Sequence, residues 1–330
     1  MTNQQPSVVG VDVPAKTNLT LHVGAPRAEW GGRHALDTIY CGVGIVDTVA
    51  VSRRAPGSGF TFALTGDHLG DLAAATPVAA DAASSGTVLP ATVSSESAEP
   101  ASVTLSDGDA RRNHAVKALL ALAQAAGREP DVAIRLTKRI PVAAGLGGGS
   151  ADAAGALLAL NVLWGLDWPI DRLRAIAATL GADMPFCLTG ALAHGTGFGE
   201  IIDDIPVDSP RGRDLAARGF TGRLLVGAYD DALSTPAVYA AFDRLGAGDG
   251  GDNHLQHAAV TLHPRSGLAI DAAKAAGATQ AFVSGSGPSV VAFTPTAAVE
   301  DAVRRAWGSA GCIDRIIAAD APATPRITVG

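Results

Sequence analysis

The sequence predicts a two-domain α+β protein, and three observations point to it. The chain has 330 residues, which is enough for two cores of ordinary size. Short segments rich in β-branched residues alternate with longer segments of helix formers. A glycine cluster at residues 195–200 predicts a turn near a domain junction. We therefore expect an N-terminal domain over residues 1–195 and a C-terminal domain over residues 196–330.

Composition and charge argue against a nucleic-acid-binding, membrane-spanning or secreted protein. The formal net charge of -7 argues against a general nucleic-acid surface, because phosphate backbones are bound by clustered Lys and Arg. Apolar residues make up 47% of the chain, but no run of about 18 of them lacks a charge or a glycine cluster. The first seven residues are polar, without the apolar core of a signal peptide. We expect a cytoplasmic protein with no membrane partner and no nucleic-acid partner.

Cysteine and histidine usage gives no sign of a metal centre. Cys41, Cys187 and Cys312 are isolated and odd in number, which favours reduced thiols over disulfides or a zinc site. His254 and His257 are three residues apart on a predicted helix, but the sequence offers no third ligand near them. We expect no metal ion held by protein side chains.

The N-terminal segments read as strands. Residues 8–13 and 19–23 predict two strands with residues 14–18 between them, and residues 38–51 predict a longer one. Lys16 lies in the connection, where a lone lysine is usually a solvated charge.

A low-complexity stretch follows at about residues 74–106. It consists largely of Ala, Ser, Thr, Pro and Glu, so it buries too little apolar surface to order itself, and we expect a flexible insertion. After it, Asp109 is placed to cap an amphipathic helix that carries Val116, Leu119 and Leu122.

The central feature is a glycine loop between a strand and a helix. Val132, Ile134 and Leu136 alternate as in a strand, Pro141 marks its exit, and a helix begins near Ser150. Glycines let the backbone approach a ligand, and the free N–H groups at the start of a helix favour an anion such as a nucleotide phosphate. The alternative is a glycine-rich turn that only lets the helix pack closely. A Rossmann motif needs Gly where Ser150 stands, and the Lys-Ser/Thr of a Walker loop is absent.

The remaining segments continue the alternation. Helices are predicted over residues 151–164 and 170–180, a strand over 223–229, and a helix that starts at Ser234-Thr235-Pro236, with proline well placed in its first turn. Residues 281–289 form a third glycine-rich loop between strand patterns, and residues 297–307 and 313–318 add a helix and a strand.

The stretch Pro141 to Ala154, with Gly-Leu-Gly-Gly-Gly-Ser-Ala-Asp-Ala-Ala at its centre, resembles the ATP loop of the GHMP kinases, the superfamily of galactokinase, homoserine kinase and mevalonate kinase. Pro-Ala-Lys-Thr-Asn, with Lys16 and Asn18, and Gly-Ala-Asp-Met-Pro, with Asp183, resemble two further motifs of one branch of that superfamily. That branch phosphorylates a CDP-linked methylerythritol on its 2-hydroxyl in non-mevalonate isoprenoid synthesis. The implied fold is an N-terminal domain like ribosomal protein S5 domain 2 and a ferredoxin-like C-terminal domain, with the site between them.

The resemblance also implies roles for individual residues. Lys16 and Asp183 would be catalytic, with Asp183 accepting or orienting the proton of the attacking hydroxyl and Lys16 keeping it ionised. ATP, with Mg²⁺ bridging its phosphate oxygens, would be bound by Asn113 and by loop residues Pro141, Ala143, Ala144, Gly145, Leu146, Gly147, Gly148, Gly149, Ser150 and Ala151. The small-molecule substrate would contact Asn18, His34, Thr235, Pro236, Tyr239, Gly285, Ser286 and Gly287.

The chain departs from the branch at three places, and other readings stay open. Arg33 stands where the branch has a tyrosine beside the histidine, and His114 and His254 also differ from its usual residues. An arginine plane can still stack on a base. A kinase of the homoserine or mevalonate type, a mevalonate-type decarboxylase, or a non-catalytic sensor that binds ATP and a metabolite are the alternatives. Either a monomer or a homodimer is expected.

Overall fold

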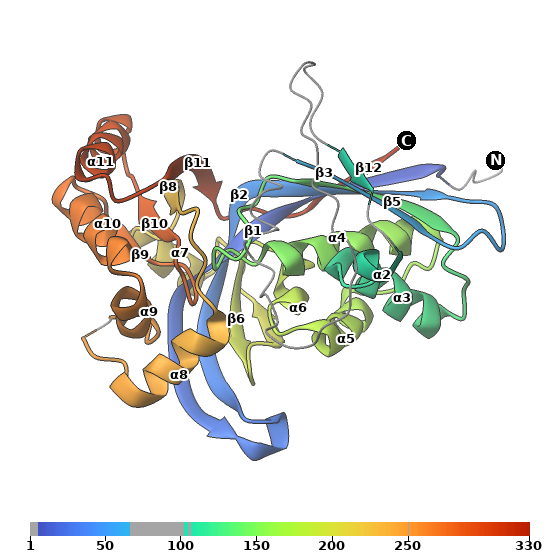
Figure 1. Ribbon diagram of the computed structural model, residues 1–330, viewed down its shortest axis with the longest axis horizontal. Helices are drawn as coiled ribbons and strands as arrows, with labels where there is room; N and C mark the ends of the chain where they lie inside the picture. Colours follow the sequence, from blue (N-terminus) through green and yellow to red (C-terminus); the bar gives the residue numbers. More distant parts are fainter. Residues whose placement is uncertain (1–5, 67–101, 105–106, 250) are drawn as a thin grey trace, which may run out of the picture.

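The computed structural model describes residues 6–66, 102–104, 107–249 and 251–330 of the chain (Figure 1). Most of the low-complexity insertion expected over residues 74–106 lies outside the described residues. The described part of it, Ser102–Thr104, is a short strand paired with the strand Thr61–Gly66, so the expectation of a loop is wrong for these three residues.

Strands and helices alternate along the chain, as predicted. The strands are β1 (Val8–Arg27), β2 (Arg33–Arg53), β3 (Thr61–Gly66), β4 (Ser102–Thr104), β5 (Val132–Lys138), β6 (Leu192–Thr196), β7 (Ile201–Asp204), β8 (Gly222–Ala228), β9 (Gln280–Val283), β10 (Val290–Phe293), β11 (Arg315–Ala321) and β12 (Arg326–Val329). The helices are η1 (Ala28–Trp30), α2 (Asp107–Ala110), α3 (His114–Ala126), α4 (Gly148–Leu163), α5 (Ile170–Leu180), α6 (Met184–Cys187), α7 (Pro210–Ala217), α8 (Thr235–Leu245), α9 (Gln256–Leu262), α10 (Pro264–Ala275) and α11 (Ala297–Ala310).

The larger sheet organises the N-terminal part of the molecule. Over the described residues it has eight strands in the order β12-β1-β2-β5-β3-β4, with β6 paired to β2 and β7 paired to β6. Strands β3 and β5 run parallel to each other, whereas β1 and β2 form a long antiparallel pair. Helices α2 to α6 lie together on one face of the sheet, below it in Figure 1. This mixed sheet with helices on one face is the α+β arrangement expected from the sequence.

Strand β1 is longer than expected. The sequence predicts two strands with residues 14–18 between them, but the structure has one strand from Val8 to Arg27. Pro14 does not break it because the register with β2 shifts between Pro14 and Ala15, and a bulge tolerates a residue without an N–H donor. Lys16 and Asn18 therefore lie on a strand rather than in a loop, and the sheet holds both in place.

Helix α4 is buried on nearly every side because its residues are small. An added Cβ at Gly155 would come within 2.7 Å of Val13 and 2.8 Å of Val49, so the glycine allows the helix to lie directly on β1 and β2. The neighbouring helix α3 begins at His114 rather than after Asp109. Its N-cap is Asn113, whose side chain accepts a hydrogen bond from the Ala115 N–H at 2.9 Å.

The smaller sheet is antiparallel, with the order β11-β8-β10-β9. The chain runs through it as β8, helices α8 to α10, β9, β10, α11 and β11, which is the βαββαβ pattern of a ferredoxin-like domain. The glycine turn at residues 195–200 lies in the β6-β7 hairpin of the larger sheet, and β12 returns to that sheet after β11. The division of the chain at residue 195 stays a prediction.

One hydrophobic cluster joins the two sheets. Val11 and Leu119 of the first region and Phe220, Val226 and Phe293 of the second are almost fully buried members of the same core. The two sheets are therefore packed against each other through a shared core.

Candidate active site

The glycine loop lies against β1. The Lys16 backbone N–H donates to the Leu146 carbonyl at 2.9 Å, and an added Cβ at Gly147 would come within 2.6 Å of Lys16 Cγ. Gly147 also has a φ of +69°, which disfavours any other residue. The Ala151 N–H donates at 2.9 Å to the carbonyl of Gly147, the N-cap residue just before α4. The amides of Gly148, Gly149 and Ser150 come before it, at the positive end of the helix dipole, and suit an anion.

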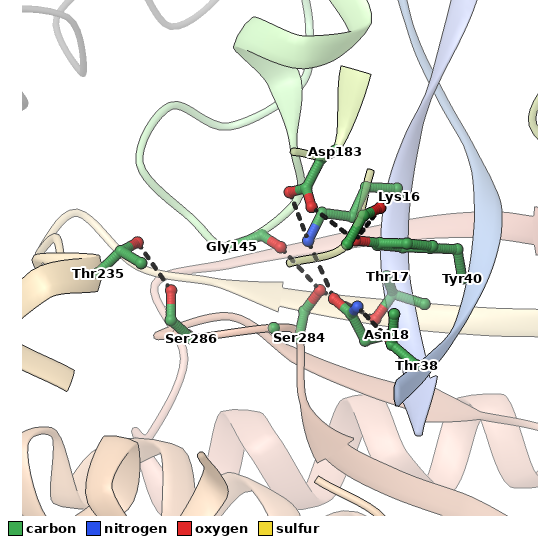
Figure 2. Close-up of polar contacts among 12 residues, drawn as sticks. Lys16, Thr17, Asn18, Thr38, Tyr40, Gly145, Asp183, Thr235, Ser284 and Ser286 are labelled. Atoms are coloured by element: carbon green, nitrogen blue, oxygen red, sulfur yellow. Dashed lines mark hydrogen bonds and ion pairs between the residues drawn. The ribbon is translucent and has the colours of Figure 1, made fainter. Parts of the chain in front are cut away.

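Lys16 and Asp183 meet in front of this loop (Figure 2). Lys16 Nζ lies 3.1 Å from Asp183 Oδ2 and donates to Asn18 Oδ1 at 3.0 Å. The Asn18 amide in turn donates to the Thr38 hydroxyl at 2.8 Å, which fixes the amide with its oxygen toward the lysine. The Lys16 side chain is 7% exposed and that of Asp183 is 31% exposed. The carboxylate therefore faces the cleft, and the lysine lies on the buried side of it.

A second cluster of charges lies behind the loop. Lys138 Nζ, at the end of β5, is bonded to Asp47 Oδ2 and lies 2.9 Å from Asp152 Oδ2 in the first turns of α4. Asp47 Oδ1 also accepts the backbone N–H groups of Arg139 and Ile140, at 2.6 Å and 2.9 Å. These three side chains are nearly inaccessible, and burial raises the pKa of Asp152 to about 7 although Lys138 opposes the shift. The cluster ties both ends of the glycine loop to the sheet.

The far wall of the cleft is aromatic. The His34 ring stacks on Tyr239 with 5.1 Å between centroids, and His34 Nε2 lies 2.9 Å from Asp243 Oδ1. The Arg33 guanidinium lies 4.5 Å from the centre of the Phe198 ring. These side chains come from β2, from the β6-β7 turn and from α8, so both domains contribute to the wall.

The third glycine loop closes the cleft from the side of the smaller sheet. The Ser284 hydroxyl donates to the Gly145 carbonyl at 3.1 Å, which links this loop to the first one. The Thr235 and Ser286 hydroxyls lie 2.9 Å apart at the entrance. Asn253 holds the loop from behind, because its buried amide donates to the carbonyls of Val283 and Gly285, both at 2.9 Å.

A single cleft of about 1270 Å³ brings most of the predicted site residues together. Lys16, Asn18, His34, Asn113, Pro141, Ala143, Ala144, Gly145, Gly147, Gly148, Gly149, Ser150, Asp183, Thr235, Pro236, Tyr239, Gly285, Ser286 and Gly287 line it. Leu146 and Ala151 do not, because their side chains are buried in the core. Asn113 borders the cleft, and the contact of its side chain is the N-cap of α3.

Several residues of the cleft were missed by the sequence analysis. Tyr40 donates to Asp183 Oδ1 at 3.0 Å, and Asp243 and Phe198 belong to the aromatic wall. His114 Nδ1 is buried without a hydrogen-bonding partner among the described residues, next to Gly149, and burial lowers the pKa of its ring. Tyr40 and Asp243 sit in no motif, Phe198 lies in the glycine cluster at residues 195–200, and His114 follows the candidate Asn113, but only the fold brings these side chains to the cleft. Asn253 comes directly before His254, and nothing in the sequence assigned it a role.

No cluster of three or more His, Cys, Asp or Glu side chains is present among the described residues that would hold a metal ion by itself. None of the helices in the described ranges is long and apolar enough to cross a membrane.

Comparison with known proteins identifies the class. The family model described as the GHMP kinases N terminal domain matches residues 113–191, and the one described as GHMP kinases C terminal matches residues 237–313. The chain therefore belongs to the GHMP kinases, which use ATP to phosphorylate small molecules, and the family prediction is confirmed.

Relatives within this family carry a more particular name. The chain is 60% identical to the 4-diphosphocytidyl-2-C-methyl-D-erythritol kinase of Bifidobacterium adolescentis, over 98% of this chain and 95% of that one. It is 36% identical to the kinase of the same name from Streptomyces avermitilis, over 97% and 99%.

Solved structures agree on the fold. A crystal structure of 4-(cytidine 5'-diphospho)-2C-methyl-D-erythritol kinase matches with a TM-score of 0.64 and 26% identity, covering 95% of this chain and 99% of that one. The homoserine kinase of Cytophaga hutchinsonii matches with a TM-score of 0.68 over 99% of each chain, but at 16% identity this likeness shows the fold alone.

Proposed function

We propose that this protein transfers the γ-phosphoryl group of ATP to the 2-hydroxyl of 4-diphosphocytidyl-2-C-methyl-D-erythritol, in isoprenoid precursor synthesis. The observation that carries the proposal is the position of the Lys16–Asp183 pair, 3.1 Å apart, between the glycine loop and the aromatic wall. A nucleotide phosphate on the loop and a base on the wall would bring the reacting groups together at this pair. The names of relatives up to 60% identical support the choice of substrate.

The glycine loop would bind the phosphates through its backbone. Phosphoryl transfer depends mainly on positioning and charge stabilisation, and the amides that open α4 supply donors that need no rearrangement. The loop is fixed by Lys16 on one side and by the buried Lys138 cluster on the other. Mg²⁺ would enter with the nucleotide on its phosphate oxygens and neutralise part of their charge. We propose no protein side chain as its ligand.

Asp183 would hold the attacking hydroxyl. Its carboxylate faces the cleft, so it can accept a hydrogen bond from the substrate hydroxyl and direct its lone pair at the phosphorus. Lys16 would balance the negative charge that gathers between carboxylate and phosphoryl group. Asn18 fixes the direction of the lysine.

The aromatic wall would hold the cytosine. His34 and Tyr239 present a stacked pair, and Asp243 holds His34 Nε2, which leaves Nδ1 for other contacts. The planar guanidinium of Arg33 offers a surface on which a base can stack. We further propose that the protein is cytoplasmic and acts as a monomer or a homodimer.

The test is ADP release by the purified protein with Mg-ATP and the CDP-linked methylerythritol, beside homoserine and mevalonate. Turnover is expected with the cytidine substrate alone, and it should be lost in Asp183→Ala. Turnover with homoserine or mevalonate instead would overturn the substrate assignment. ATP binding without turnover on any of the three would indicate a sensor, and phosphate with carbon dioxide from a diphosphomevalonate would indicate a decarboxylase.

A further inference from the structure

Tyr40 lies next to the Lys16–Asp183 pair. It is on β2, opposite Asn18 of β1, and its side chain is fully buried. Its ring stacks on Phe186 with 4.9 Å between centroids, and Lys16 Nζ lies 5.9 Å from the ring centre. Its hydroxyl donates to Asp183 Oδ1 at 3.0 Å, and the Gly199 carbonyl is a second acceptor at 3.3 Å (Figure 2).

The glycine cluster in the β6-β7 hairpin makes room for this side chain. An added Cβ at Gly195 would come within 2.5 Å of Tyr40 Cε2, and one at Gly199 within 2.5 Å of the Tyr40 hydroxyl. Gly199 also has a φ of +111°, which other residues rarely adopt. Gly195 and Gly199 of the predicted turn therefore leave the space in which the Tyr40 side chain lies against Asp183.

The two oxygens of Asp183 have different donors. Lys16 Nζ is the partner of Oδ2, and the Tyr40 hydroxyl donates to Oδ1. The carboxylate therefore cannot rotate without losing one of these two contacts. We propose that Tyr40 is a positioning residue for phosphoryl transfer, whose hydroxyl fixes the Asp183 carboxylate in the orientation that receives the substrate hydroxyl. This inference rests on the proposed function and adds a third member to the Lys16–Asp183 pair.

Tyr40 remains a donor at every working pH, since burial and the neighbouring Asp183 raise the pKa of its phenol well above the ordinary value. The other titratable groups near Asp183 are Lys16 from β1, Cys187 from α6 and Tyr239 from α8. Burial raises the pKa of Cys187 and of Tyr239, so both of these side chains stay neutral.

The test is Tyr40→Phe, which removes the hydroxyl and keeps the ring on Phe186. We expect kcat to fall about ten- to hundredfold, the range expected for a hydrogen bond to a charged group, with the KM for ATP little changed. Tyr229→Phe is the matched control, because Tyr229 is also buried but does not line the cleft. It should leave kcat unchanged.

Two further measurements separate positioning from a structural role. In an Asp183→Asn background, Tyr40→Phe should reduce the residual rate no further, because the tyrosine acts through the aspartate. A crystal structure of Tyr40→Phe without substrate should show the Asp183 carboxylate rotated away from the orientation that its two contacts now fix. This second readout needs no substrate, so it stands even if the proposed substrate is wrong. An unmoved carboxylate, or equal losses in both backgrounds, would overturn the inference.

Discussion

Two lysine–aspartate clusters border the same glycine loop, and they differ in their access to the cleft. Lys16 pairs with Asp183, whose side chain is 31% exposed, whereas Lys138 pairs with Asp47 and Asp152, which are 0% and 5% exposed. The first cluster keeps a carboxylate open to the cleft. In the second cluster, Asp47 accepts backbone N–H groups of the loop after β5, and Asp152 joins α4 to Lys138. The same pair of residue types therefore suits chemistry in one place and support in the other, and solvent access decides which.

The clearest way to break this comparison is Asp183→Asn. We expect kcat to fall about 10³-fold, since the variant loses the charge that orients the hydroxyl, while the midpoint of thermal unfolding moves by only a few degrees. Asp37→Asn, an exposed carboxylate paired with His194, is the matched control and should keep full activity. Severe unfolding of Asp183→Asn would place this residue with the supporting cluster instead.

The second cluster should give the opposite result. Lys138→Met leaves Asp47 and Asp152 buried without their cation, so the free energy of unfolding should fall by about 3 to 5 kcal/mol. Urea unfolding at pH 7 measures this. Lys16→Met should cost clearly less stability, because Asp183 can still reach water, and yet lose turnover. Equal losses of stability in the two variants would contradict the distinction.

Gly147 tests the loop between the clusters. In Gly147→Ala the new methyl group must displace the Lys16 stem, which lies 2.6 Å from its position, so we expect kcat to fall about tenfold or more. Gly57→Ala controls for backbone strain. Gly57 has a similar φ of +77° but nothing within 4 Å, so its variant should lose about 1 kcal/mol of stability and no activity. Equal activity in the two variants would show that the Lys16 stem can move aside without a loss of kcat, which would contradict the prediction.

The last prediction concerns the pH dependence of stability. Burial raises the pKa of Asp152 to about 7, above its value of about 4 in the unfolded chain. Between these two values the folded state holds a proton that the unfolded state has released. The contribution of this group is therefore greatest below about pH 4 and decreases as the pH rises toward 7, by up to about 1.4 kcal/mol per pH unit.

Asp152→Asn should remove that decrease, because an amide does not titrate. Urea unfolding of both proteins at intervals from pH 4.5 to 8.5 gives the difference between them, in which the other groups cancel. A difference that does not change with pH would show that Asp152 is ionised throughout, which would contradict the prediction.

The sequence predicted the parts of this molecule that local patterns encode. The glycine loop, the strand before it and the helix after it follow from residue spacing, and α5 begins and ends where expected, at Ile170 and Leu180. The family motifs led to Lys16 and Asp183, which the fold brings within 3.1 Å of each other. Here the short-range signal and the folded structure agree.

Other features depend on contacts between distant segments, which no single-sequence pattern reveals. Tyr40 looked like one more residue of a strand, and its partner Asp183 lies 143 positions away. Asp47 lies in the same predicted strand and was assigned no role, yet its carboxylate accepts the backbone N–H groups of the loop after β5. Residues 14–18 looked like a connection because a proline starts them, whereas the pairing with β2 keeps them in a strand.

The position of β12 has a consequence for how the chain is made. Val9 of β1 pairs with Val329, so one flank of β1 is covered by a segment that the ribosome makes much later. Until then the N–H and C=O groups on that flank stay open, next to a row of valines. We therefore expect the nascent chain to carry an exposed strand edge, and to depend on chaperones, until β12 emerges.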